Sequence, residues 1–125
     1  MFSLSKTTTV VFILCLLICR NASATLISVP AQYATIQAAI LASVNGDTVA
    51  VSPGTYYENI NFRGRNIVLT SLFYLNNDTS YISSTIINGS QPTNPDTASC
   101  IILNSYEDST TLIQGFTITG GAGTR

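Results

Sequence analysis

The chain has 125 residues, with five lysines and arginines, six aspartates and glutamates and no histidine, which gives a formal net charge of −1. The absence of histidine excludes nucleophilic triads that use a histidine base, and it excludes histidine-ligated metal centres within these residues. Any acid–base chemistry would therefore have to come from carboxylates.

The first 24 residues match the pattern of a secretory signal peptide. Lys6 supplies positive charge, residues 10–19 form an unbroken apolar run, and Ala22-Ser-Ala24 has the small residues of a cleavage site. We expect cleavage between Ala24 and Thr25, and a mature protein that is secreted and lies outside the cell or at the cell surface.

Two other interpretations of this N-terminal segment remain open. A membrane span would need roughly 18–20 apolar residues, and the run over residues 10–19 is shorter. A bacterial lipoprotein signal would explain the cysteine at the end of Leu16–Cys19, but Ile18 stands where such signals normally have a small residue. We favour ordinary export and expect no membrane span in the mature chain.

The mature chain, residues 25–125, is mildly acidic. It has three arginines, Arg63, Arg65 and Arg125, against six carboxylates, a net charge of −3. Three scattered arginines give no basic stripe to neutralise a phosphate backbone, so nucleic acid is not an expected partner. The single cysteine, Cys100, is more typical of a small buried hydrophobic residue than of a reactive thiol or half of a disulfide. The length suffices for one small domain and not for two.

The mature chain opens with a short strand and an amphipathic helix. Residues 25–29 alternate like a strand and are stopped by Pro30. Asn45-Gly46 then supplies a helix stop. Between them one apolar stripe follows helical spacing, formed by Ile36, Ala39, Ile40 and Val44. We expect this helix to cap one open end of the β structure that follows.

From Thr48 onward the chain breaks into very short apolar segments closed by Gly, Asn or Pro. Strands of this length cannot bury both faces in an ordinary sheet, but they can do so by coiling into a solenoid. We therefore predict an all-β fold, a right-handed parallel β-helix (solenoid) with one N-terminal capping α-helix, cut off at its C-terminal end. The predicted segments are Val49–Val51, Asn59–Phe62, Asn66–Thr70, Thr85–Ile87, Cys100–Leu103, Leu112–Ile113 and Phe116–Ile118.

Candidate glycan contacts lie between residues 56 and 63. Glu58 comes directly after Tyr56-Tyr57, and an acid beside two aromatic rings is the pairing that sugar-binding surfaces use; a turn with a packed tyrosine has the same sequence. Arg63-Gly-Arg65 could clamp an acidic sugar, or it could be a charged turn that faces solvent. The candidate glycan contacts are therefore Tyr56, Tyr57, Glu58 and Arg63.

The other polar motifs indicate turns. Glu107-Asp108 could offer oxygens to Ca²⁺, but the spacing matches no calcium loop and a solvated turn is the simpler interpretation. Asp47 is expected to bind turn backbone. Residues 120–123 are too incomplete for a nucleotide-binding fingerprint. No catalytic, cofactor-binding or metal-binding residue is predicted.

Two segments of the mature chain fit the acceptor pattern for N-glycosylation, Asn77-Asp-Thr79 and Asn88-Gly-Ser90. They would matter only in a eukaryotic secretory pathway. Asn21-Ala-Ser23 also fits the pattern but lies in the predicted signal peptide.

The order of these motifs resembles the N-terminal part of the pectin-lyase-like superfamily. The resemblance covers about residues 27–121 and looks most like pectin methylesterases and secreted bacterial repeat proteins with right-handed parallel β-helices. The matching runs are Tyr33–Ile40, Val49–Tyr56, Glu58–Ile60, Ile67–Leu69 and Thr85–Gly89. Esterases of this kind place their catalytic residues on later coils. The resemblance therefore implies that any such residues would lie beyond residue 125. The Asn-rich stretch Ser71–Ser84 and the strand and turn of Leu112–Gly121 favour the repeat-protein branch.

Two functions follow as expectations. The first is a secreted β-helix repeat protein that works as a surface or polysaccharide-associated module, with extracellular polysaccharide or another cell surface as partner. The alternative is the N-terminal fragment of a carbohydrate-active enzyme, a pectin esterase or polysaccharide lyase, whose catalytic coils are missing. In either case residues 1–24 are the signal peptide and residues 25–125 are the N-terminal cap and first coils of one domain.

Overall fold

The computed structural model describes residues 23–124. Most of the predicted signal peptide, residues 1–22, lies outside the described residues. Within residues 23–124 no helix is both long enough and apolar enough to cross a membrane.

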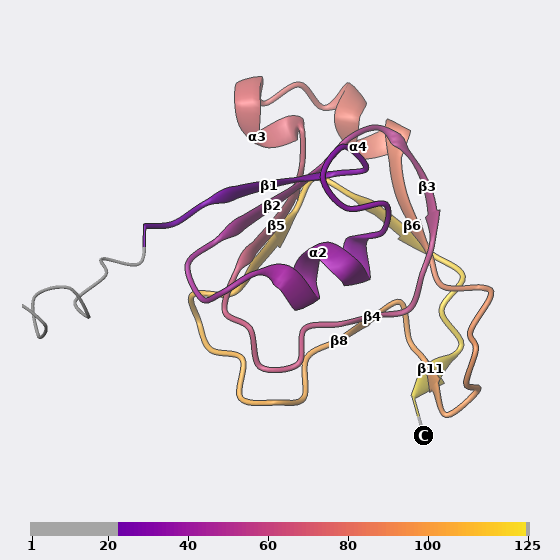
Figure 1. Ribbon diagram of the computed structural model, residues 1–125. Helices are drawn as coiled ribbons and strands as arrows, with labels where there is room; N and C mark the ends of the chain where they lie inside the picture. The colour runs from indigo at the N-terminus through magenta and orange to yellow at the C-terminus, as the bar shows by residue number, and fades with distance from the viewer. Residues whose placement is uncertain (1–22, 125) are drawn as a thin grey trace, which may run out of the picture.

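Three helices and eleven strands make up the described chain (Figure 1). The helices are α2 (Ile36–Ala42), α3 (Phe73–Asn76) and α4 (Ser80–Ser84). The strands are β1 (Leu26–Val29), β2 (Thr48–Val51), β3 (Gly54–Tyr57), β4 (Ile60–Asn61), β5 (Val68–Ser71), β6 (Thr85–Asn88), β7 (Thr97–Ala98), β8 (Ile101–Ile102), β9 (Leu112–Gln114), β10 (Thr117–Thr119) and β11 (Gly123–Thr124).

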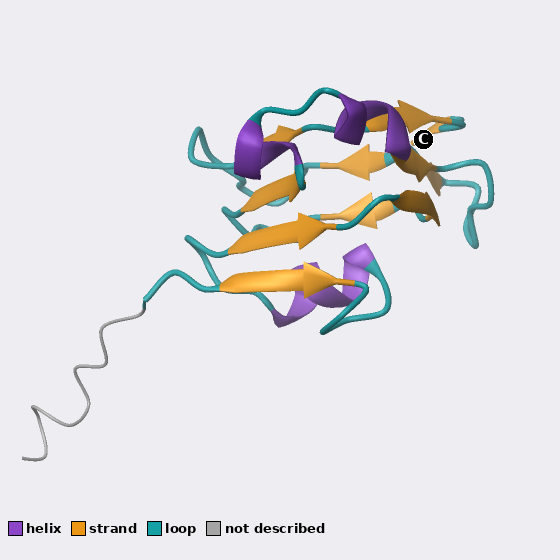
Figure 2. Ribbon diagram, turned by 90° about the horizontal axis from the view of Figure 1, so that it is seen from above, coloured by secondary structure: helices purple, strands orange, loops and turns teal. Residues whose placement is uncertain are grey.

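The strands form four small sheets. Three are parallel, with the orders β1-β2-β5-β9, β10-β6-β3 and β4-β8, and the pair β11-β7 is antiparallel. In the largest sheet one register row brings together apolar residues from all four strands, namely Ile27, Val49, Leu69 and Ile113. Figure 2 shows strands lying side by side, with α2 at one end of the row and α3 and α4 toward the other.

The core lies between the parallel sheets and α2. Alternate residues along each strand point inward, so Val49 and Leu69 from the largest sheet meet Ile87 from β6 in one buried cluster. Phe62 and Ile60 close another side of this cluster. Each such buried side chain stabilises the fold by about 1.5–3 kcal/mol.

Helix α2 packs on this core through one face, on which Ile36, Ala39 and Ile40 are fully buried. The predicted stripe also included Val44, but the helix ends at Ala42 and Val44 is 58% exposed. The hydroxyl of Thr35 caps the helix by accepting the N–H of Ala38 at 3.1 Å. The helix thus buries its apolar face while a backbone N–H group of its first turn has a hydrogen-bond partner.

The predicted fold class, an all-β right-handed parallel β-helix with one capping helix, is wrong. The structure is mixed, with about 16% helix and 33% strand, and it has several short parallel and antiparallel sheets. Its small size fits a small α/β domain. The class was misjudged partly because residues 71–84 contain helices where an Asn-rich loop was expected.

Local hydrogen bonds mark the end of α3 and the start of α4. Asn77 takes a left-handed conformation, with φ 57°, and its N–H donates to the Phe73 carbonyl at 2.8 Å, which ends α3. The Asp78 carboxylate accepts the N–H of Ser80 at 2.9 Å at the start of α4. Of the Asn and Asp residues that suggest a loop in the sequence, Asn77 is thus the C-cap of α3, and Asp78 binds the backbone just before α4, whose N-cap is Thr79.

Candidate functional site

A polar cleft of about 220 Å³ lies where α2, β4, β7 and β8 come together, and we call it the polar cleft. Three amides, two threonines and one guanidinium line it beside a single aliphatic side chain. The lining residues are Gln37, Asn59, Asn61, Arg63, Thr93, Thr97 and Ile102. No carboxylate is among them.

The side-chain amide of Gln37 is fixed by two hydrogen bonds between α2 and the main chain of β4. The Gln37 Nε2 donates to the Asn61 carbonyl at 3.0 Å, and the Asn61 N–H donates to Gln37 Oε1 at 2.8 Å. The side chain of Gln37 therefore pairs with β4 as a neighbouring strand would. This contact holds the rim of the cleft in place.

A second amide, Asn59, is fixed by a different part of the chain. Its Nδ2 donates to the carbonyls of Gly89 at 3.1 Å and Ser99 at 3.0 Å. Both amide hydrogens are used in these bonds, so its Oδ1 remains as an acceptor. A rigid acceptor at a cleft wall can select a ligand hydroxyl.

Arg63 is the only one of the four predicted glycan contacts that lines the polar cleft. It has φ 50°, its N–H donates to Asn61 Oδ1 at 2.8 Å, and its side chain is exposed. Among residues 23–124 no hydrogen bond or ion pair engages its guanidinium. The group is available to a ligand.

The other predicted glycan contacts do not join Arg63 in the polar cleft. The Tyr56 ring packs against the core and its hydroxyl donates to the Ser52 carbonyl at 2.8 Å. Burial, and then the negative charge of Glu58, raises the pKa of Tyr56. Tyr57 is 55% exposed.

Glu58 is engaged with the first turn of α2. Its carboxylate accepts the N–H groups of Ile36 and Gln37, each at 2.9 Å. Backbone groups that an α-helix leaves without intrahelical partners are satisfied in this way, and the negative charge lies at the positive end of the helix dipole.

Arg63 and Arg65 do not form the predicted clamp, because their side chains lie at different places. Arg65 turns to the other end of α2, where its Nε donates to the Ser43 carbonyl at 3.2 Å and its Nη2 to the Leu41 carbonyl at 3.0 Å. A cation is favourable beside these last carbonyls. Only Arg63 faces the polar cleft.

The adjacent acids Glu107 and Asp108 bind turn backbone. Glu107 accepts the N–H groups of Ser105 and Gly64, both at 2.8 Å. Burial opposes ionisation of Glu107, but these hydrogen bonds outweigh it and lower its pKa. Hydrogen bonds from the Thr110 hydroxyl and N–H lower the pKa of Asp108. In the part of the chain that the structure describes, no group of three or more His, Cys, Asp or Glu could hold a metal ion.

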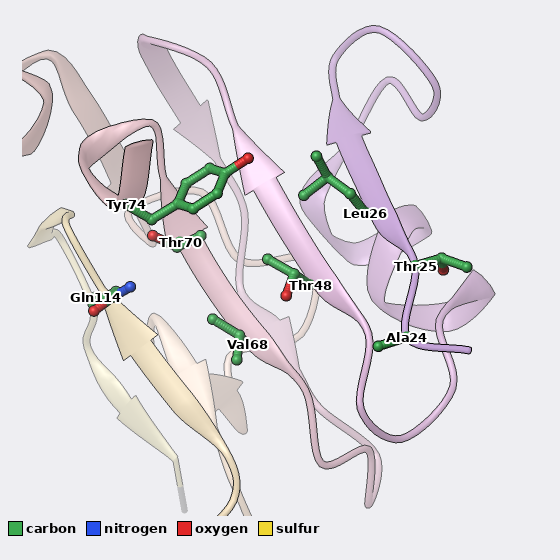
Figure 3. A pocket seen from close by; sticks show the side chains of 8 residues that line it. All are labelled: Ala24, Thr25, Leu26, Thr48, Val68, Thr70, Tyr74 and Gln114. Carbon is green, nitrogen blue, oxygen red and sulfur yellow. The ribbon is translucent and has the colours of Figure 1, made fainter. Parts of the chain in front are cut away.

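A second cavity, a groove of about 330 Å³, crosses the outer face of the largest sheet, and we call it the outer groove (Figure 3). Figure 3 shows the ring of Tyr74, from α3, beside Thr70. The lining residues are Ala24, Thr25, Leu26, Thr48, Val68, Thr70, Tyr74 and Gln114. Sequence reasoning missed Tyr74 and Gln114; the only signal was the short apolar run Leu72–Leu75 directly before an Asn-rich stretch.

Comparisons with known proteins give no match: no family model, no curated protein and no solved structure is significantly similar to the chain.

Proposed function

We propose that the chain is a secreted module that associates with extracellular polysaccharide, and that it binds sugar in the polar cleft. The observation that supports this proposal best is the composition of the cleft. Amides and threonines can donate to and accept from sugar hydroxyls, and a guanidinium can donate to them. Ile102 offers an apolar surface to a sugar ring.

Arg63 is the residue that we expect to contribute most to affinity. Its guanidinium has no partner among the described residues, so binding would not first have to break an internal ion pair. The side chains of Asn59 and Asn61 are already held by hydrogen bonds to backbone groups, Asn59 through its Nδ2 and Asn61 through its Oδ1. Pre-organised groups lose little conformational entropy when a ligand binds.

The alternative, a carbohydrate-active enzyme, has less support. Ester hydrolysis and elimination both need a positioned acid or base, commonly a histidine or a carboxylate. Neither the polar cleft nor the outer groove is lined by an aspartate or a glutamate. These two cavities therefore favour binding over turnover.

Binding is tested with the full chain secreted through its own leader and a set of neutral and acidic polysaccharides, by affinity electrophoresis and titration calorimetry. Arg63→Gln should weaken binding roughly tenfold, as expected when one strong hydrogen-bonding group is lost. Arg65→Gln is the matched control, because it removes the same charge. It should lower the thermal midpoint and leave the affinity of the folded protein unchanged. Equal losses for both variants, or no binding by the wild-type chain, would contradict the proposal.

A further inference from the structure

The backbone nitrogen of Thr25 lies at 2.9 Å from Asp47 Oδ1. The other carboxylate oxygen, Oδ2, accepts the N–H of Val44 at 2.9 Å. Asp47 is only 3% exposed. A buried carboxylate is thus aimed at the first residue that the predicted cleavage after Ala24 would leave.

We propose that Asp47 is a binding site for the α-ammonium group of the mature chain, which signal-peptide cleavage creates at Thr25. The inference rests on the export part of the proposed function. Hydrolysis of the Ala24–Thr25 peptide bond by water gives a carboxylate on Ala24 and an amine on Thr25, which takes up a proton at neutral pH. The nitrogen that donated as a peptide N–H then donates as a cation.

The surroundings of Thr25 support this assignment. The Thr48 N–H donates to the Thr25 carbonyl at 2.9 Å, so Thr25 is already held beside the β1–β2 pair. The Asp47 carbonyl accepts the N–H of Val68 at 3.0 Å, which fixes the aspartate from the side of β5. The ammonium would need no rearrangement to meet its partner. A charge-assisted hydrogen bond is stronger than the neutral bond that it replaces.

Few other charges act on this pair. The elements packed around it, β1, α2, β2 and β5, contain no titratable residue within their bounds. Arg65 binds the carbonyls at the end of α2, Tyr74 lines the outer groove with Thr25, and Asp108 lies in a turn whose N–H binds Asn66. Asp47 is therefore the carboxylate in hydrogen-bond contact with Thr25.

The pair gives stability a definite pH window. Burial opposes ionisation of Asp47, but the hydrogen bonds from Val44 and Thr25 outweigh it and lower its pKa. That contribution is present above the unfolded value of about 3.9 and is lost as the pH falls through the lower folded value. The ammonium should have a pKa above its ordinary value of about 7.7–8.0. The contribution of the ammonium to stability is complete below its unfolded pKa and is lost as the pH rises through its higher pKa in the folded protein.

The test compares two secreted proteins made from the full chain. One is native; the other has Gly-Ser inserted between Ala24 and Thr25, so that cleavage leaves a two-residue extension and moves the ammonium away. Each is made with Asp47 and with Asp47→Asn, and N-terminal sequencing confirms the first residue. Because Thr25 keeps a peptide N–H in the extended protein, this four-way cycle isolates the effect of the charge.

We expect Asp47→Asn to raise the unfolding equilibrium constant roughly tenfold more in the native form than in the extended form at pH 7. The difference should disappear at alkaline pH, and isotope-labelled methylation of the α-amine should report a raised pKa by NMR. Equal effects of Asp47→Asn in both forms, or an unperturbed amine, would overturn the proposal. If the native leader directs no export, a leader of the host in its place supplies the same four proteins. Failure of export then counts against the proposed function, and the cycle still decides the ion pair.

Discussion

Glu58 and Arg65 bind opposite ends of the same helix: the carboxylate accepts the first N–H groups of α2 and the guanidinium donates to its last carbonyls. Each charge has the sign that the helix dipole favours at its end. A helix of seven residues is too short to be stable alone. Both contacts therefore contribute to holding α2 on the core.

Removal of the Glu58 carboxylate should destabilise the fold. Glu58→Ala leaves the N–H groups of Ile36 and Gln37 without an acceptor, at a cost of about 1–3 kcal/mol. Glu58→Gln keeps one acceptor oxygen and should cost less. Thermal denaturation followed by circular dichroism measures both. Asp96→Ala, at an exposed carboxylate, is the control; a midpoint as high for Glu58→Ala as for this control would contradict the role of Glu58.

Adjacent positions of α2 should respond very differently to a charge. Ile40 is fully buried, so Ile40→Asp places an unpaired carboxylate in the core and should cost several kcal/mol. Leu41 is 47% exposed, so Leu41→Asp should change stability little. Yield of soluble protein and chemical denaturation compare the two. If both variants unfold at the wild-type denaturant concentration, α2 does not pack as described.

Of the two glycosylation patterns, only the one at Asn77 should be used in a eukaryotic secreting cell. Residues 75–80 are all exposed, and Figure 1 shows the α3–α4 connection on the outside of the molecule. Asn88 belongs to β6, the central strand of its sheet, and its Oδ1 accepts the Ser90 N–H at 3.0 Å. Gly120 lies against Asn88 so closely that no Cβ would fit.

The glycan is read as a mobility shift that an N-glycosidase reverses. Thr79→Ala should abolish the shift while it keeps Asn77 and its left-handed cap, and Ser90→Ala should leave the shift unchanged. A glycan that survives Thr79→Ala would place the modification at Asn88 and refute the assignment.

The secreted chain should neither de-esterify nor cleave pectin. Glu107 and Asp108 are occupied with turn backbone, and no carboxylate lines the polar cleft or the outer groove. Assays of methanol release and of unsaturated product, with and without Ca²⁺ and beside known enzymes as positive controls, measure this. Turnover that survives purification and is lost in Asp108→Asn would prove the expectation wrong.

Much of the strand pattern could be predicted from the sequence, because it depends on local apolar runs. Val49–Val51 and Thr85–Ile87 fall within β2 and β6. β3 could not be found in this way. Its sequence begins at Gly54, directly after Pro53, which indicates a turn, and the strand is fixed only by pairing with β6, far along the chain.

In the candidate site, too, features that depend on local sequence could be predicted and contacts between distant residues could not. Arg63 could be chosen because an arginine can bind an acidic sugar, and the structure places it at a cleft. Glu58 was placed with the tyrosines beside it, whereas its partners are the N–H groups of Ile36 and Gln37 in an element that precedes it by about twenty residues. When a side chain binds backbone groups that are distant in the sequence, the residues next to it in the sequence do not indicate this contact.

The strand pairing described above also bears on how fast this chain can fold. None of the described strands pairs with the next strand through a tight hairpin. Even the paired strands with the smallest sequence separation, β2 and β5, have β3 and β4 between them in the chain. Contacts between distant residues form only after a large loss of chain entropy, so rates fall as sequence separation grows. Refolding should therefore take milliseconds to seconds, as it does for other domains dominated by non-local pairing. During that interval the unpaired strands are exposed to neighbouring chains, and dilute solution should give the highest yield of native protein.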